Sequence, residues 1–159
     1  MSRIKSVKYL VVHCAATPPS RDIGVKEIRA MHKQRGFNDV GYHYVIRRDG
    51  TIEKGRADTV MGAHVSGYNA VSLGICLVGG INAKGWSEQN YTPAQFSALA
   101  GLLDQLKERH PQAEILGHRD LSPDKNRDGK ISRNEWMKDC PCFDVRDWLA
   151  GNPPQFQVR

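Results

Sequence analysis

The chain has 159 residues, of which 40% are apolar and 25% charged, as in ordinary soluble globular proteins. This length predicts one domain with a core of its own. The formal net charge of +6 favours an anionic partner, such as nucleic acid, a membrane surface or an anionic polymer. The basic residues are scattered and no recognition motif accompanies them, so we expect no binding to nucleic acid.

No stretch of the chain approaches the length of a membrane span, so we expect no membrane insertion. The start, MSRIKSVKYLVVHC, lacks the longer apolar run and the cleavage site of a signal peptide. The four cysteines (Cys14, Cys76, Cys140 and Cys142) do not resemble a disulfide framework in a chain of this size. We therefore expect reduced thiols in a cytosolic product.

Residues 7–12 form a short β-branched apolar run, which predicts a buried strand. The run ends at His13, where a site residue would sit, although a lone histidine there is more often structural. Alternation along a strand places Cys14 on the face opposite to His13, so the two are not expected to bind one metal. A helical period of apolar side chains then predicts a helix over residues 24–34, ended by Gly36.

Residues 41–53 predict a β-hairpin, because two strand-like runs flank an Asp-Gly turn. Alternation sorts the side chains of the first strand into two faces, one with Tyr42, Tyr44 and Ile46 and the other with His43 and Val45. A tyrosine on a strand is ordinarily a packing residue, so this pattern alone gives Tyr42 no role.

The second half of the chain predicts further strands and helices. A polar loop over residues 56–71 contains His64 and Asn69 and leads into a buried strand over residues 72–78. A capping box with proline at the first helical position begins a helix over residues 92–109. The remaining predicted elements are a strand over 113–116, a short helix over 143–149 and a loose tail over 151–159. This irregular alternation predicts an α/β fold with a central mixed sheet and helices on its faces.

Residues 124–135 match the twelve-position calcium loop of EF-hands throughout. The expected ligands are Asp124, Asn126, Asp128, the carbonyl of Lys130, Ser132 and Glu135, with Gly129 at the sharp turn. The alternative is a solvated Asp-Gly turn, since these residue types are also common in turns. Pro123 breaks any entering helix, so we expect a structural calcium clip and not a sensor.

Five blocks occur in an order that resembles the phage lysozyme-type N-acetylmuramoyl-L-alanine amidases. They are VHCAAT (12–17), GYHYVIRRDGT (41–51), LVGGI (77–81), TPAQ (92–95) and CPCFD (140–144). These amidases belong to the zinc amidase and peptidoglycan-recognition-protein superfamily. The resemblance covers about residues 7–149 and implies one amidase domain over 1–150. It also implies a mixed sheet of five or six strands, flanked by helices, with a zinc cleft on one face.

By matching position, the resemblance implies zinc ligands, catalytic residues and a substrate groove. The implied zinc ligands are His13, His118 and Cys140, a set suited to zinc with one position left open. The implied catalytic residues are Tyr42 and Lys138, and the implied groove residues are His64, Asn69 and His43. Without the resemblance, Lys138 would be read as a solvated surface lysine. Zinc-activated water would hydrolyse the amide between N-acetylmuramic acid and the first L-alanine of the stem peptide.

The chain departs from the resembling phage enzymes between His118 and Lys138, where they have a brief connection and this chain has the calcium loop. We expect calcium to fix this connection and so to position Lys138 and Cys140. Cys142 competes with Cys140 for the metal only if the segment between them is extended.

A peptidoglycan-binding module without activity is the main alternative function, and the presence of Cys140, Tyr42 and Lys138 favours an enzyme. A calcium-dependent interaction protein is a third class, disfavoured by the single loop. The expected context is a monomeric phage or prophage endolysin that accumulates in the host bacterial cytoplasm and then reaches the cell wall.

Overall fold

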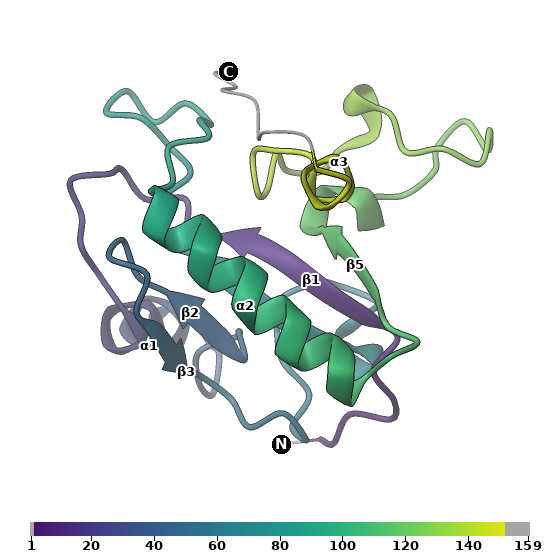
Figure 1. Ribbon diagram of the computed structural model, residues 1–159, viewed down its shortest axis with the longest axis horizontal. Coiled ribbons are helices and arrows are strands. Elements are labelled where there is room, and N and C mark those ends of the chain that lie inside the picture. Colours follow the sequence, from purple (N-terminus) through teal and green to yellow (C-terminus); the bar gives the residue numbers. More distant parts are fainter. Residues whose placement is uncertain (1, 152–159) are drawn as a thin grey trace.

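A five-stranded mixed sheet forms the centre of the protein in the computed structural model, which describes residues 2–151 (Figure 1). The strands are β1 (Tyr9–Cys14), β2 (Tyr44–Ile46), β3 (Ile52–Lys54), β4 (Ser72–Leu77) and β5 (Glu114–Gly117). They lie in the order β3-β2-β4-β1-β5. Within this sheet, β2 and β3 are antiparallel, whereas β2 is parallel to β4 and β1 is parallel to both β4 and β5. The predicted α/β fold with a mixed sheet of five or six strands is thereby confirmed, with five strands in the sheet. The predicted tail lies outside the described residues beyond Gly151.

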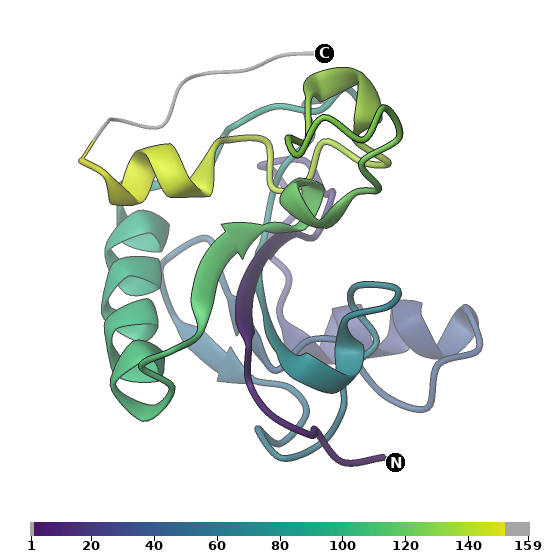
Figure 2. The same cartoon turned by 90° about the vertical axis from the view of Figure 1, so that its right-hand side faces the viewer.

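Helices cover both faces of this sheet (Figure 2). They are α1 (Val25–Gln34), α2 (Pro93–Arg109) and α3 (Val145–Leu149), with 3₁₀ turns η1 (Asn69–Val71), η2 (His118–Leu121) and η3 (Arg133–Glu135). On one face, a leucine stripe of α2 packs on Leu10 and Val12 of β1, because its apolar residues recur every three or four positions. On the other face, α1 packs through Ile28. Within residues 2–151, no helix has the length and apolar character of a membrane span.

The start of α2 follows the local signal in the sequence. Thr92 is the N-cap, and its side chain accepts a hydrogen bond from the Gln95 N–H at 3.1 Å. The Gln95 side chain accepts from the Thr92 N–H at 3.0 Å, so the predicted capping box is confirmed. The short helix α3 begins later than predicted, because Asp144 is its N-cap and Phe143 is a fully buried core residue.

Strand β1 extends two residues beyond its predicted end. His13 and Cys14 pair in parallel register with Cys76 and Leu77 of β4, so both belong to the ladder. Since Leu10 and Val12 face α2, alternation sends the side chain of His13 to the opposite face. His13 is therefore held on a paired strand and not in a loop.

The predicted face of Tyr42 was wrong. Tyr44 and Ile46 pack on the α2 side of the sheet, whereas Tyr42 packs beside Val45 on the α1 side. Between them, His43 is bonded to Gly74 twice: its imidazole Nδ1 accepts the Gly74 N–H at 3.0 Å, and its own N–H donates to the Gly74 carbonyl at 2.9 Å. Strand β2 begins only at Tyr44, so Tyr42 lies outside the paired strand and two-residue alternation does not extend back to it.

Candidate active site

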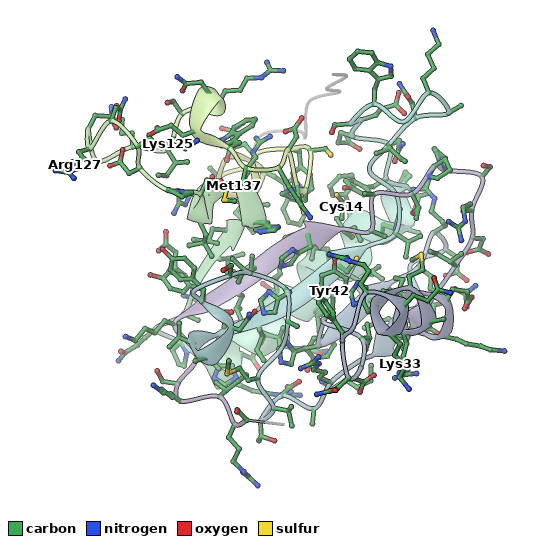
Figure 3. The ribbon with its side chains drawn as sticks, turned by 180° about the vertical axis from the view of Figure 1, so that it is seen from behind. Cys14, Lys33, Tyr42, Lys125, Arg127 and Met137 are labelled. Carbon is green, nitrogen blue, oxygen red and sulfur yellow. The ribbon has the colours of Figure 1, made fainter. Side chains whose placement is uncertain are left out.

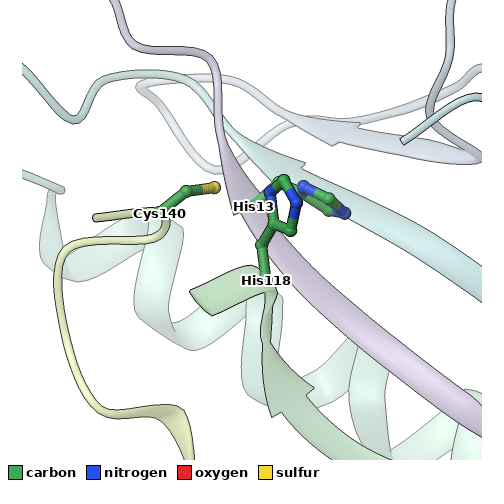
Figure 4. A group of neighbouring side chains, drawn as sticks. All are labelled: His13, His118 and Cys140. Carbon is green, nitrogen blue, oxygen red and sulfur yellow. The ribbon is translucent and has the colours of Figure 1, made fainter. Parts of the chain in front are cut away.

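Two neighbouring parallel strands bring two histidines together at their carboxyl ends. His13 lies near the end of β1, and His118 directly follows β5. Their rings are 4.6 Å apart between centroids. Cys140 enters from the C-terminal loop, where its Sγ accepts the Cys14 N–H at 3.0 Å and its carbonyl accepts the Arg119 N–H at 2.9 Å. One ligand atom from each of His13, His118 and Cys140 lies within 4.8 Å of the others (Figure 4).

Two imidazoles and a thiolate are a donor set that suits zinc and leaves one coordination position open. Burial lowers the pKa of His13 well below its usual value, with smaller effects from His64 and His118, so the imidazole is neutral and keeps a lone pair. Burial also raises the pKa of the Cys140 thiol well above its usual value. A bound cation is the charge that would stabilise a thiolate at this depth. The three residues therefore fit a zinc ion.

The other two thiols nearby have different environments. Cys142 is buried, and its Sγ donates to the Gly80 carbonyl at 3.3 Å. Its φ of +75° shows that the chain is not extended here, so the condition for competition with Cys140 is not met. Cys14 presents its main-chain N–H to Cys140. Its thiol, which alternation places away from His13, interacts with those of Cys140 and Cys142.

The metal-fitting group opens into a cleft of about 890 Å³ on the α1 side of the sheet. The residues that line it include His13, His118 and Cys140, the expected catalytic pair Tyr42 and Lys138, and the expected groove residues His64 and Asn69. The Tyr42 ring lies 5.1 Å from that of His13 between centroids. Tyr42 lies on the α1 side of the sheet (Figure 3). Burial raises the pKa of Tyr42 well above its usual value, so its hydroxyl is a neutral hydrogen-bond donor.

Lys138 is exposed at the edge of this cleft. Burial is the main cause that lowers the pKa of His118, and the charge of Lys138 is the next. The same charge contributes to the lowered pKa of His13. The ammonium group therefore acts electrostatically on both histidines. A cation at this position would stabilise negative charge that develops in the cleft.

The three expected groove residues differ in position. Asn69 Oδ1 accepts the main-chain N–H groups of His64 and Val65, each at 2.9 Å. His64 is only 8% exposed, and its Nδ1 lies 2.8 Å from His13 Nε2. His43 is fully buried, with its ring nitrogens bonded to the Gly74 N–H and the Val60 carbonyl. Both ring nitrogens of His43 are thus engaged by main-chain groups.

The loop over residues 124–135 folds back on its own carboxylates. Oxygens of Asp124, Asp128 and Glu135 lie within 4.8 Å of one another. Glu135 is only 3% exposed, and the Ser132 N–H is the largest contribution that lowers its pKa to about 2, so it is ionised at neutral pH. Among the described residues, Asp124 Oδ1 is buried and has no hydrogen-bond partner.

A buried ion pair that sequence reasoning missed joins the two segments that carry His118 and Cys140. Arg119 Nη1 and Asp139 Oδ1 are 3.0 Å apart, and both side chains are almost fully buried. The Trp136 ring, next to Glu135 in the chain, lies 3.9 Å from the Arg119 guanidinium carbon. Arg119, Asp139 and Trp136 each lie next to an expected metal ligand in the sequence. This proximity is the local signal that could have indicated the buried ion pair.

Comparisons with known proteins place this geometry in a family. Residues 3–142 match the family described as N-acetylmuramoyl-L-alanine amidase. The chain is 49% identical to an endolysin of Enterobacteria phage K11 over 138 residues, which are 87% of this chain and 82% of that protein. It is 43% identical to an endolysin of Escherichia phage T7 over 148 residues, 93% of this chain and 89% of that protein. The solved amidase LysC from Clostridium intestinale URNW superposes with a TM-score of 0.65 at 27% identity, over 85% of this chain and 76% of that one.

Proposed function

This chain belongs to the N-acetylmuramoyl-L-alanine amidase family, and we propose that it works as a zinc-dependent endolysin of a phage or prophage. It is a peptidoglycan hydrolase. The bond cleaved is the amide between N-acetylmuramic acid and the first L-alanine of the stem peptide. The observation that carries the zinc proposal is the meeting of His13, His118 and Cys140 in one cleft.

A zinc ion held by His13, His118 and Cys140 supplies Lewis acidity, which makes water a better nucleophile at neutral pH and polarises a carbonyl. Tyr42 keeps its proton and donates a hydrogen bond to the carbonyl oxygen or to the attacking water. Lys138 supplies positive charge at the edge of the cleft, where the tetrahedral intermediate becomes negative. In this proposal His64 and Asn69 form the wall of the substrate groove, and the buried His43 ring lies 5.7 Å from that of His64 between centroids.

We also propose a structural calcium ion in the loop over residues 124–135. The support is the twelve-position spacing, the convergence of three carboxylates and the unpartnered Asp124 Oδ1. Calcium would fix the end of the loop at Glu135 and so the adjacent Trp136, which stacks on Arg119. Through the buried Arg119–Asp139 pair, the loop would set the position of Lys138 and Cys140.

The test of the function compares wild type with Cys140→Ser on purified peptidoglycan, with bound zinc measured for both. We expect wild type to release free L-alanine amino termini and the variant to lose both zinc and at least about 100-fold in rate. The loss should exceed the 10- to 100-fold typical of residues that only support a metal ligand. Cys142→Ser is the matched control, since its Sγ contacts the Gly80 carbonyl, and it should keep its zinc.

A different outcome would identify the alternative function. Zinc-loaded wild type that sediments with peptidoglycan but releases no new amino termini would be a recognition module without activity. In the proposed context, the protein accumulates as a monomer in the host bacterial cytoplasm and acts on the cell wall after its release at lysis.

A further inference from the structure

The side chain of His64 belongs to a hydrogen-bonded chain that ends at His13. Nε2 of His13 and Nδ1 of His64 lie 2.8 Å apart in a buried contact. On the other side of the ring, His64 Nε2 lies 3.2 Å from Ser72 Oγ. Ser72 in turn donates to the Tyr68 carbonyl at 2.7 Å. The chain therefore runs from a main-chain carbonyl through a hydroxyl and one imidazole to a second imidazole.

The direction of every hydrogen bond in this chain can be assigned. The Tyr68 carbonyl can only accept, so the single Ser72 proton points to it and Ser72 Oγ accepts from His64 Nε2–H. The partners of His64 carry no negative charge, so its buried ring is neutral and has no second N–H. Nδ1 of His64 must then accept, and His13 Nε2 must donate. A neutral His13 keeps its lone pair on Nδ1.

Glycines and an asparagine hold the His64 ring in this position. A Cβ atom at Gly74 would lie 2.6 Å from His64 Cγ, and one at Gly62 would lie 2.7 Å from His64 Cδ2. Neither distance is compatible with a larger residue unless the ring moves. Asn69 fixes the main chain of the same loop by accepting the His64 and Val65 N–H groups. The position of the ring is thus fixed by its close packing against the two glycines and by the hydrogen bonds that hold its own main chain.

We propose that His64 is a positioning residue for His13, which holds the proton on Nε2 and so leaves Nδ1 to bind the metal. The inference rests on the proposed zinc function and gives His64 a role beyond that of a groove wall. Histidine ligands of metals generally donate their second N–H to a carboxylate, a carbonyl or a water. Here the imidazole of His64 takes that place, and Ser72 connects it to the Tyr68 carbonyl.

The test measures zinc affinity by competition with a chromophoric chelator, in the absence of peptidoglycan, for His64→Leu and His64→Asn beside wild type. His64→Leu removes the acceptor, and we expect its zinc affinity to fall about 10- to 100-fold. His64→Asn places an amide oxygen near the position of Nδ1, and its zinc affinity should stay close to that of wild type. Ser72→Ala removes the acceptor that fixes the tautomer of His64, and its zinc affinity should fall by a smaller factor.

The comparison of zinc affinity between the two His64 variants separates this role from simple packing. Both His64 variants lose the same ring, so a packing role would weaken zinc binding equally in both. Equal weakening, or wild-type zinc affinity in His64→Leu, would overturn the proposal. Neither result would bear on the amidase reaction, whose failure would appear instead as absent amino termini from zinc-loaded wild type.

Discussion

At the scale of single residues, the chemistry of the cleft depends on groups whose protonation is set by burial. Tyr42 is half-buried beside His13, and burial raises the pKa of its phenol well above the usual value. It can therefore donate a hydrogen bond throughout the neutral pH range. Tyr44, two residues further along the chain, faces the opposite side of the sheet, where its hydroxyl donates to Asp58 at 2.7 Å.

These two tyrosines make a matched pair for mutagenesis. Tyr42→Phe should lower the amidase kcat about 10²- to 10³-fold, the usual effect of losing one donor that stabilises developing negative charge. Bound zinc should be unchanged, because Tyr42 is not among the metal-fitting residues. Tyr44→Phe should leave kcat unchanged. Equal rates for Tyr42→Phe and wild type on purified peptidoglycan would rule out the catalytic role of the hydroxyl.

At the scale of elements, the loop over residues 124–135 connects two segments of the active site without forming part of the sheet. Its main-chain N–H groups already converge on Glu135: the Ser132 N–H bonds to Oε1 at 3.0 Å and the Lys125 N–H to Oε2 at 2.6 Å. The loop also meets its own entry segment, where the Met137 N–H donates to Ser122 Oγ at 3.2 Å. A cation at the centre of the loop would further stabilise the conformation that these hydrogen bonds already hold around Glu135.

Calcium should raise the melting temperature of zinc-loaded wild type, because an ion that binds only the folded state stabilises it by about 2.7 kcal/mol at 100 times its Kd. Glu135→Gln should abolish the calcium-dependent rise, since the loop loses its bidentate ligand. Glu108→Gln, at an exposed position of α2, is the control and should keep it. Scanning calorimetry in calcium-free and calcium-containing buffer measures the difference. If calcium changes neither melting temperature nor amidase rate in wild type, the loop is a turn and not a metal site.

At the scale of the whole molecule, the net charge of +6 is the property most relevant to an anionic wall. The residues that line the cleft include Ile28 and Met31 of α1. Helix α2 lies on the opposite side of the sheet from α1 (Figure 2). Exposed cations such as Lys138 lie at the edge of the cleft itself. In the proposed function, attraction of the net charge to the wall would act over longer distances than the chemistry at the metal-fitting group.

Salt should weaken binding to the wall more than it weakens catalysis. The Debye length falls from about 10 Å at 0.1 M to about 3 Å at 1 M, which screens attraction between exposed charges but affects a buried site much less. We expect the fraction that sediments with peptidoglycan to fall over this range, while kcat on a soluble muramyl peptide changes little. Sedimentation that is independent of salt would show that the net charge does not retain the protein on the wall.

The sequence by itself determined the features whose signals are local. The capping box at Thr92, the leucine stripe of α2 and the Asp-Gly hairpin each depend on residues within a few positions, and the structure confirms them. The motif order also predicted the family, since the blocks come from the whole chain and are specific in combination.

Only the tertiary structure decided which distant side chains meet. The contact of His64 with His13 spans 51 positions and the Arg119–Asp139 pair spans 20, and no periodicity relates such residues. The face of Tyr42 also required the fold, because β2 begins only at Tyr44 and two-residue alternation holds only within a paired strand. Local propensity acts over a few residues, whereas a site is assembled by the packing of strands and loops far apart in the chain.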